Sequence, residues 1–498
     1  MSNEFLLKKL NQGPCKSSEL TQIIVEKCNL SKAAARKRLT RLPSPISRLN
    51  NITLPNNESV FLLEEHRDSA DFKYLIQKIL EDNNTAEGRV LRAIGLAGQT
   101  IPFAYLAKAS GTLFRLPSKG KHSYLRKILD HLLENGLVEF FQDARYGKIV
   151  AAPGWQAMSP STRAILDVES IFLSMIQKWL INLGFSSMKA MQVRQETKCC
   201  LHGVFEWDLM GPCYLNGLLF KRAKTTKNGF IVGDIVLGKK ITKEDLKPFF
   251  YKLDSLNNQP KTLPFQSLYI ADSFEPNALN MLRNKGIMIA SPYNIYGGEV
   301  AELLASLKDV LSKAYESLKN TPEDAFKIIE KIIKIEGAAL NLRGIFLDLL
   351  VARLYSRHGY TCRIREKYKL NNGDGFEFDV VAERADERIF VEGKALASGN
   401  ALNLKEVEKW ATTTLPRFMR WLKEEGNNHS VTNSIVFVVS TEFHPDCGDY
   451  ISSLTTRNKK VRIKFYDSGY ITQQLTKFHD NTILYSFKEQ FLNKKIEL

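Results

Sequence analysis

The stretch from Phe376 to Ala397 reads FEFDVVAERADERIFVEGKALA, and it sets Asp379, Glu392 and Lys394 inside two runs that otherwise have the composition of buried β-strands. Successive side chains of a strand point to opposite faces, so Glu377 and Asp379 share one face and their aromatic neighbours the other. Glu392 and Lys394 project together from the second run. We therefore expect a hairpin that brings two carboxylates and an ammonium together; a solvated hairpin with surface charges is the alternative.

Asp379 and Glu392 are suited to hold a divalent cation. Carboxylate oxygens are the ligands that Mg²⁺ prefers, and the ion keeps waters that catalysis can use. A bound ion polarises a phosphodiester and lowers the pKa of its water. Lys394 would orient that water or stabilise the negative charge that develops during attack. Glu377 is a lesser candidate on the same face. The residues thus predict phosphodiester hydrolysis with Mg²⁺ or Mn²⁺.

The spacing of Asp379, twelve residues and then Glu392-Gly-Lys394 resembles the PD-(D/E)XK, or restriction-endonuclease-like, nuclease superfamily. In that family an acid on the preceding helix often joins the site, and Asp348 in IFLDLLVARLYSRHGY stands at this position. A helix and an apolar strand are expected after the lysine, and residues 404–425 and 434–443 fit that order. The resemblance covers roughly residues 341–491 and implies that Asp348, Asp379, Glu392 and Lys394 are catalytic. The proline that names the motif is absent, because Phe378 precedes Asp379.

Residues 165–305 repeat this order of elements, as a tandem duplication would. IFLSMIQKWLINLGF parallels IFLDLLVARLYSRHGY, and VFEWDLMG parallels EFDVVAE. Asp208 then stands opposite Asp379, and Asp234 takes the place of Glu392. Val236, however, stands where Lys394 would be. We therefore predict a degenerate site at Asp208 and Asp234.

Other residues could replace the groups that this first copy lacks. Leu173 or Ser174 stands in place of the helix acid, depending on which end of the helix is aligned. Glu169, one helical turn earlier on the same face, is a substitute acid. Lys239 or Lys240 is a substitute for the missing lysine, from a shifted position.

Residues 1–66 predict three short helices followed by a β-hairpin around Pro-Asn-Asn. Ser31 is the expected N-cap of the third helix. Residues 1–50 hold ten Lys and Arg against three acids. This order resembles a winged helix-turn-helix, whose third helix enters a DNA groove; a charged helix of a protein-interaction module is the alternative. The candidate DNA contacts are Lys32, Arg36, Lys37, Arg38 and Arg41.

Residues 86–157 resemble a second winged helix after a linker-like segment near residues 81–88. RVLRAIGLAG, IPFAYLAKASG and HSYLRKILDHLLENG are the expected helices, the last closed by Gly136. A hairpin around Asp-Ala-Arg-Tyr-Gly follows. A dimerisation or docking role is the alternative for this less basic copy. The candidate phosphate contacts are Lys119, Lys121, Arg126, Lys127, Arg145 and Lys148.

The composition is that of a multidomain globular protein with a polyanionic partner. The chain has 498 residues and a formal net charge of +16, which favours nucleic acid or an anionic surface. No apolar run is long enough for a transmembrane helix. Seven cysteines without a C-x-x-C pair indicate neither a zinc site nor a disulfide framework. We expect a cytoplasmic protein with no membrane partner.

The predicted fold class is multidomain α/β: two winged helices (1–66 and 86–157), a degenerate restriction-endonuclease-like domain (165–305), a helical connector (306–337) and a nuclease domain (338–492). The predicted function is a metal-dependent DNA endonuclease of restriction, anti-phage defence or mobile-element type, acting on duplex DNA. A non-catalytic DNA-binding scaffold and an RNA-cleaving nuclease with the same site are the alternatives. One complete site per chain suggests a homodimer for double-strand cleavage. No Walker-type motif is present, so any NTP dependence would come from a partner such as an ATPase.

Overall fold

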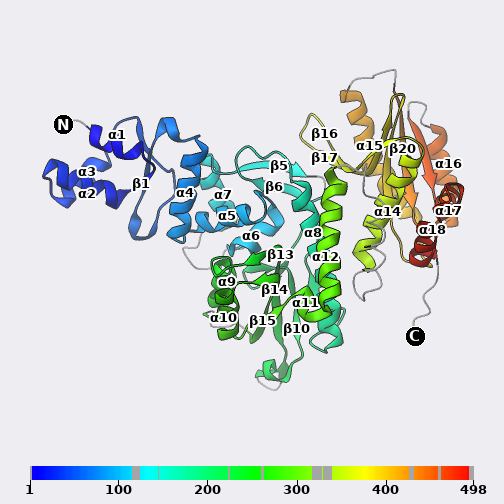
Figure 1. The fold of residues 1–498 in the computed structure, drawn as a ribbon, viewed down its shortest axis with the longest axis horizontal. Coiled ribbons are helices and arrows are strands. Elements are labelled where there is room, and N and C mark those ends of the chain that lie inside the picture. The colour runs from blue at the N-terminus through cyan, green and yellow to red at the C-terminus, as the bar shows by residue number, and fades with distance from the viewer. Residues whose placement is uncertain are drawn as a thin grey trace.

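A computed structural model describes residues 3–114, 124–143, 145–222, 225–258, 263–316, 328, 332, 339–425, 431–457 and 461–492. It confirms a multidomain α/β chain. Figure 1 shows an N-terminal arm of small helices and sheets, a central unit around one larger sheet, and a C-terminal unit around another. Lys119, Lys121 and most of the predicted connector, 317–327, 329–331 and 333–337, lie outside the described residues.

The first 66 residues form three helices and a small antiparallel sheet with the strand order β1-β3-β2. Ser31 caps the third helix, as its hydroxyl oxygen accepts a hydrogen bond from the Ala34 N–H at 3.2 Å. Leu20, Ile24 and Leu39 pack in a common core with the last strand. The elements are α1 (Glu4–Leu10), β1 (Cys15–Lys16), α2 (Ser17–Cys28), α3 (Lys32–Leu39), β2 (Ile46–Arg48) and β3 (Val60–Leu63).

The next module has the same order of helices and strands, with an additional helix in front of it. The predicted linker near residues 81–88 is instead the end of that helix, α4, and the beginning of α5, where the Thr85 hydroxyl accepts a hydrogen bond from the Gly88 N–H at 2.9 Å. A Cβ on Gly88 would lie 2.4 Å from the Leu80 carbonyl, so the two helices meet at this glycine. The sheet order is β4-β6-β5. The elements are α4 (Ala70–Asp82), α5 (Ala86–Leu96), β4 (Thr100–Pro102), α6 (Phe103–Ser110), α7 (Leu125–Glu134), β5 (Glu139–Asp143) and β6 (Gly147–Ala151).

Two five-stranded sheets follow, and they have the same strand order: β7-β10-β13-β14-β15 and β16-β17-β18-β20-β22. In each sheet the first three strands are antiparallel and the last two continue in parallel. The strands of the first are β7 (Gln192–Val193), β10 (Leu209–Cys213), β13 (Gly229–Ile241), β14 (Phe265–Phe274) and β15 (Met288–Ala290). Those of the second are β16 (Thr361–Lys369), β17 (Gly375–Arg384), β18 (Glu387–Lys394), β20 (Thr432–Val439) and β22 (Arg462–Tyr466).

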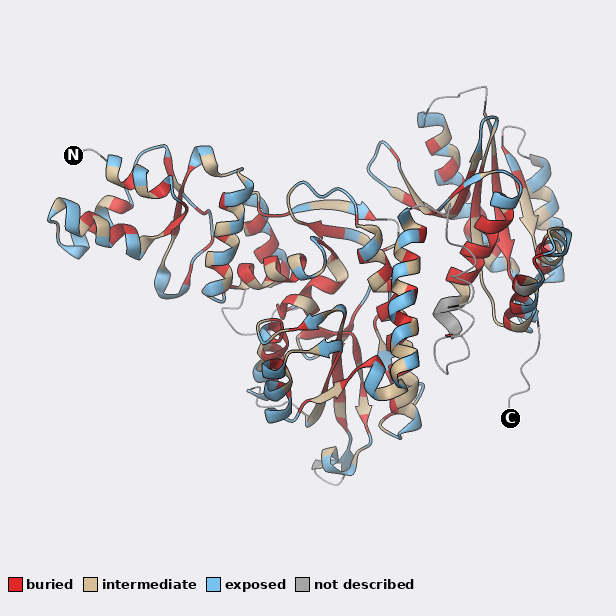
Figure 2. Ribbon diagram, in the orientation of Figure 1, coloured by how far each residue is buried: buried red, intermediate tan, exposed pale blue. Residues whose placement is uncertain are grey.

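Helices cover both faces of each sheet, and the central strands of both are largely buried between them (Figure 2). The helices of the first unit are α8 (Pro160–Asn182), α9 (Lys247–Asn257), α10 (Pro276–Asn284), α11 (Pro292–Tyr296) and α12 (Gly298–Glu316). Those of the second are α14 (Ala339–Arg357), α15 (Leu404–Glu425), α16 (Gly448–Arg457), α17 (Ser468–Lys477) and α18 (Asn481–Phe487). Short two-stranded ribbons are formed by β8 (Cys200–His202) with β9 (Phe205–Trp207), β11 (Phe220–Arg222) with β12 (Thr225–Lys227), and β19 (Ala401–Leu402) with β21 (Glu442–Phe443).

The two units share one apolar core. Val168 and Phe172 on α8, Leu307 on α12, and Phe346 and Leu350 on α14 belong to a single cluster of buried side chains that continues into both sheets. Burial of apolar surface is non-directional and roughly proportional to area. The shared cluster therefore fixes the C-terminal sheet beside α8 of the preceding unit.

A second apolar cluster lies on the face of the β17–β18 hairpin that packs against α15. Phe418 on α15 is fully buried, with its ring centroid 4.7 Å from that of Phe390 and 5.4 Å from that of Phe378. Replacing such a residue by alanine removes its transfer free energy and leaves a cavity.

Phe418→Ala is therefore expected to lower the free energy of unfolding of the C-terminal unit by about 3–5 kcal/mol. Urea unfolding followed by the fluorescence of Trp410 and Trp421, which lie in the same core, would measure it. The matched control is Tyr485→Ala, at a residue that is 66% exposed, with an expected change within about 0.5 kcal/mol. Equal midpoints for the two variants would contradict this packing.

Candidate active site and its counterpart in the first copy

The pairing of β17 with β18 sets the two predicted metal ligands side by side. Val380 pairs with Val391, so Asp379, one residue before, and Glu392, one residue after, are neighbours across the hairpin. The Gly393 N–H donates a hydrogen bond to Asp379 Oδ2 at 2.7 Å, which fixes the orientation of that carboxylate. The expected alternation of faces is present, since the phenylalanines that flank Glu377 are buried in the outer core.

All four predicted catalytic residues border one cleft with a volume of about 750 Å³. One wall belongs to the C-terminal unit, and the facing wall belongs to the β5–β6 hairpin of the second module, to α8 and to the segment after β7. The residues of the first wall include Asp348, Arg365, Glu377, Asp379, Glu392 and Lys394, and those of the facing wall include Arg145, Asp167, Arg194, Gln195, Glu196 and Thr197.

The acids of this cleft are crowded and short of positive charge. Burial raises the pKa of Glu392 well above its usual range, and the neighbouring Asp379 raises it further, while Lys394 opposes the shift. Burial followed by the repulsion of Asp379 likewise raises the pKa of Asp348. Burial raises the pKa of Glu377 to about 7. Carboxylates placed together in this way favour either protonation or a bound cation.

The chemistry of the donor set fits a small divalent ion. Glu392 makes no hydrogen bond or ion pair with the residues that the structure describes. Within the described ranges, no three His, Cys, Asp or Glu side chains gather as a metal-binding group. An ion at this place would therefore be held by Asp379 and Glu392, with water completing its shell, as Mg²⁺ commonly allows.

Arg365 is a site residue that the sequence reasoning missed. It lies in β16 with a φ of +53°, a backbone conformation uncommon outside glycine, and the strand pairing skips it between Ile364 and Glu366. Its guanidinium reaches Asp348 Oδ2 at 3.4 Å and Asp167 Oδ2, on α8, at 3.0 Å. Arg365 thus ties the helix acid of the cleft to the facing unit.

The first copy repeats this geometry in detail. Leu209 pairs with Gly233, so Asp208 and Asp234 flank that pair as Asp379 and Glu392 flank theirs. The Ile235 N–H donates to Asp208 Oδ2 at 2.9 Å, the counterpart of the bond from Gly393. Burial raises the pKa of Glu206, two residues before Asp208, to about 7, just as it does for Glu377.

Arg194 is the counterpart of Arg365, because its N–H donates to the Asp208 carbonyl at 2.7 Å across the first strand pair. Its side chain bonds Asp208 Oδ1 at 2.8 Å and Glu169 Oε2 at 2.5 Å. The shared pattern of a β-branched residue followed by arginine, Val193-Arg194 and Ile364-Arg365, was a signal that could have found both.

The lysines of the first copy are not the predicted ones. Lys239 pairs with Asp245 at 2.9 Å, and Lys240 is exposed. Instead, Lys108 from α6 lies 2.5 Å from Asp208 Oδ2, and Lys252 from α9 lies 2.5 Å from Asp234 Oδ2. Glu169 does join this cluster, as the sequence suggested, through Arg194.

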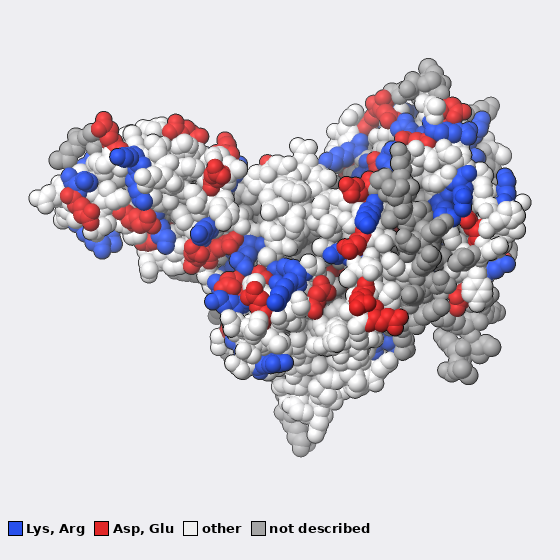
Figure 3. All heavy atoms as spheres, viewed as in Figure 1, with Lys and Arg blue, Asp and Glu red and all other residues white. Residues whose placement is uncertain are grey.

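The candidate DNA contacts divide into exposed and engaged side chains. Lys32, Arg36, Lys37 and Arg41 are exposed on or beside α3, whereas Arg38 is half-buried and donates hydrogen bonds to Asn3 Oδ1 at 2.7 Å and to Cys28 Sγ. Figure 3 shows acidic side chains interspersed among the basic ones on the N-terminal arm. The Lys and Arg side chains of the arm therefore do not form one continuous positive patch on this face.

In the second module, Arg126 and Lys127 are exposed, and the Lys148 ammonium lies 3.5 Å from the centroid of Phe140. Arg145, predicted as a phosphate contact, instead bonds Asp167 at 2.7 Å and Glu196 at 2.5 Å on the wall of the cleft. The helices of the described residues include none that is long and apolar enough to cross a membrane.

Comparisons with known proteins add little to this geometry. No protein-family profile matches the chain, and no curated protein matches it. The protein of unknown function AF1548 is 21% identical over 29% of this chain and 79% of its own, with a TM-score of 0.21. The restriction endonuclease FokI, alone and bound to DNA, is 12% and 13% identical over 93% of this chain and 84% and 83% of its own, both with a TM-score of 0.21. Scores this low establish no common fold.

The raised pKa of Glu377 leads to a stability prediction. Its carboxyl keeps a proton in the folded state up to about pH 7 but loses it near pH 4.3 when unfolded. Stability is therefore lost as the pH rises between these values, by up to about 4 kcal/mol, and then stays level. Glu377→Gln should flatten this loss in metal-free protein, as measured by thermal unfolding from pH 4.5 to 8, whereas Asp386→Asn, at a side chain 71% exposed, should leave it unchanged. Identical profiles for wild type and Glu377→Gln would refute the assignment.

Proposed function

We propose that this protein is a metal-dependent nuclease with a restriction-endonuclease-like C-terminal domain that hydrolyses phosphodiester bonds in DNA. The observation that carries the proposal is the meeting of Asp379 and Glu392 in a cleft that Lys394 also borders, with too few cations to balance the acids. Strand-borne acids of this kind, desolvated and beside a lysine, are typical of functional sites.

The roles of the residues follow from their positions. Asp379 and Glu392 would hold Mg²⁺ or Mn²⁺, which when bound polarises the phosphate and activates a water. Lys394, which borders the same cleft as these acids, would orient the attacking water or stabilise the developing negative charge. Asp348 on α14 would assist from the side, with Arg365 holding it in place at 3.4 Å.

The N-terminal arm would bring DNA to this cleft. We propose that its two modules are winged helices, because each has the order helix, strand, helix, helix and hairpin that suits insertion of the third helix into a groove. Since one complete site cuts one strand at a time, double-strand cleavage would use two chains or two successive events. A cytoplasmic role in restriction or anti-phage defence belongs to this proposal by analogy of domain content only.

A DNA-binding scaffold without catalysis is the second candidate. It is favoured by one observation: in the first copy, Asp208, Asp234 and Glu169 are each paired with an internal Lys or Arg. A scaffold without catalysis, however, would not require Asp379 and Glu392 to lie together beside Lys394 without enough positive charge to balance them.

Cleavage of supercoiled plasmid in Mg²⁺ tests the proposal. The wild-type protein should nick or linearise the plasmid, and Asp379→Ala and Lys394→Ala should each lower the rate by at least about 100-fold, since general acid–base and electrostatic contributions are of this size. Lys240→Ala, at an exposed lysine of the first copy, is the control and should cut normally. Cutting that survives both site changes would move the site elsewhere, and tight binding without cutting would favour the scaffold.

The DNA contacts of α3 can be tested by salt dependence. Each exposed cation that contacts a phosphate contributes about 0.9 to the slope of log K against log salt. Arg36→Ala and Lys37→Ala should each weaken binding to duplex DNA and reduce this slope by about one. Lys78→Ala, at an exposed lysine of α4, should change neither. Unchanged slopes for the α3 variants would remove this helix from the interface.

A further inference from the structure

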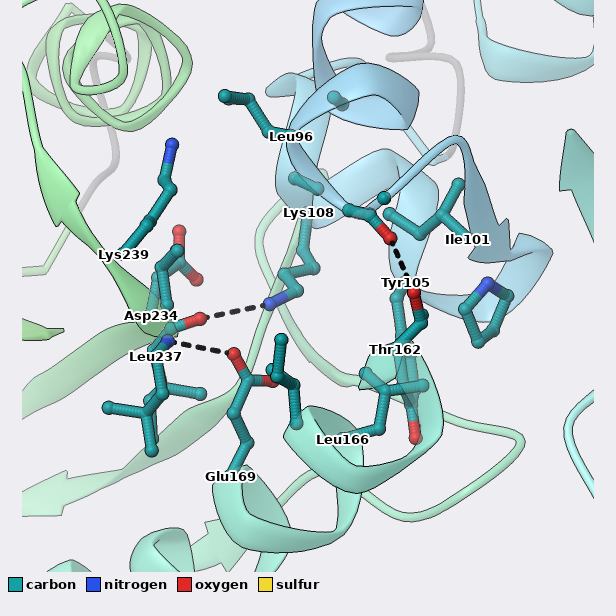
Figure 4. A pocket seen from close by; sticks show the side chains of 18 of the residues that line it. Leu96, Ile101, Tyr105, Lys108, Thr162, Leu166, Glu169, Asp234, Leu237 and Lys239 are labelled. Carbon is teal, nitrogen blue, oxygen red and sulfur yellow. Dashed lines mark hydrogen bonds between the residues drawn. The ribbon is translucent and has the colours of Figure 1, made fainter. Parts of the chain in front are cut away.

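A cation already lies in the first copy's site, and it comes from another module. The Lys108 ammonium lies 2.5 Å from Asp208 Oδ2 and 3.4 Å from the Ile235 carbonyl oxygen. The equivalents of these two groups in the C-terminal copy are the carboxylate of Asp379, one of the two proposed metal ligands, and the backbone of Gly393, the residue after the other. Figure 4 shows Lys108 reaching from α6 toward the strand that carries Asp234, where the dashed line marks its bond to the Ile235 carbonyl oxygen, with Glu169 on the facing helix.

The ammonium is charged and is held by this site. Lys108 is 7% exposed and Asp208 is 0% exposed. Burial alone would lower the pKa of Lys108, but the attraction of Asp208 outweighs it and the pKa is raised. Burial would likewise raise the pKa of Asp208, and Arg194 and Lys108 together hold it at about 2. A buried ion pair of this kind is stable only while both partners are present.

The two copies differ in how their acids are balanced. In the first, Asp208 is paired with Lys108 and Arg194 and Asp234 with Lys252, while Glu169 shares Arg194. In the C-terminal copy, Glu392 has no ion pair with a described residue, and Asp348 has only Arg365, at 3.4 Å. In the C-terminal copy, a divalent cation could therefore balance the acids. In the first copy, Lys and Arg side chains of the protein already balance them.

One acceptor of the first copy is nevertheless left without a partner. Asp234 is 5% exposed, and its Oδ1 has no hydrogen-bond partner among the described residues. A cavity of about 340 Å³ lies beside it, bordered by Lys108, Glu169, Asp234 and Arg194 and by apolar residues such as Leu166. An unpaired buried carboxylate oxygen is costly, and a cation between Asp208 and Asp234 would satisfy it.

We propose that Lys108 is an internal substitute for a divalent metal ion, so that seating of α6 and binding of Mg²⁺ or Mn²⁺ at Asp208 and Asp234 exclude one another. The first copy is then a cation site that the protein itself fills, and that site serves to dock the second module on the sheet. The inference depends on the first copy alone and does not require that the C-terminal copy cut DNA.

Mn²⁺ binding to the full chain tests it, with the C-terminal site disabled by Asp379→Asn and Glu392→Gln. In this background, titration followed by the electron paramagnetic resonance of free Mn²⁺ should find no site with Lys108 present and one site per chain after Lys108→Met. Lys108→Arg, which keeps the charge, should bind none, and adding Asp208→Asn to the Lys108→Met variant should remove the site. A folded Lys108→Met protein that binds no more Mn²⁺ than its background would overturn the proposal.

Wild-type protein in the same titration reports on the C-terminal copy separately. One Mn²⁺ per chain there, lost with Asp379→Asn, supports the proposed nuclease site without bearing on Lys108. Because Lys108→Met leaves a buried acid less compensated, folding is checked by thermal unfolding with and without Mn²⁺. A variant that is stabilised by Mn²⁺ by several degrees, or that folds only in its presence, supports the proposal. If Lys108→Met does not fold in either condition, Lys108→Gln, which keeps a donor for Asp208, is measured by the same criteria.

Discussion

Carboxylates buried on neighbouring strands must be balanced by positive charge, and much of this molecule follows from that constraint. An isolated buried carboxylate is too costly to remain ionised, so it is protonated, paired or bound to a metal. The same pair of strand positions occurs twice, as Asp208 with Asp234 and as Asp379 with Glu392. Lysines from α6 and α9 are paired with the acids of the first pair, although burial still raises the pKa of Asp234. The second is left with raised pKa values and an open cleft.

The constraint extends to the way the units are joined. Asp167 on α8 accepts from Arg145 of the β5–β6 hairpin, Arg365 of β16 and Tyr315 of α12. Asp143, the last residue of β5, pairs with Arg163 at 2.9 Å and with Lys367 of β16. Both acids are almost fully buried, and both join the second module to the strands that carry the C-terminal site. The cleft is therefore bounded by residues from three parts of the chain rather than by the nuclease-like unit alone.

Local patterns in the sequence predicted helices and strands and which side chains share a strand face. They did not predict ion pairs between residues far apart in the chain. The alternation in FEFD placed Glu377 and Asp379 on one face because a strand has a period of two. Lys108 could not be found in this way, since it lies 100 residues before Asp208 on a helix of another module. Arg145 and Arg38 were assigned to DNA by charge alone, but each is engaged within the protein. The α4 helix was overlooked because its end and the beginning of α5 had been assigned to one polar linker.

The apolar cluster that runs through α8, α12 and α14 has a consequence for how the C-terminal unit could be used outside its own chain. A domain can be moved between proteins only if the transferred piece closes its own core. Here Phe346 and Leu350 of α14 share theirs with Val168, Phe172 and Leu307 of the preceding unit. A fusion built from residues 338–492 would therefore carry an open apolar face. A piece beginning with α8 would still cut a core, because the second module and the first unit share apolar clusters through Leu113 and Cys199, so a portable piece would have to include the second module as well.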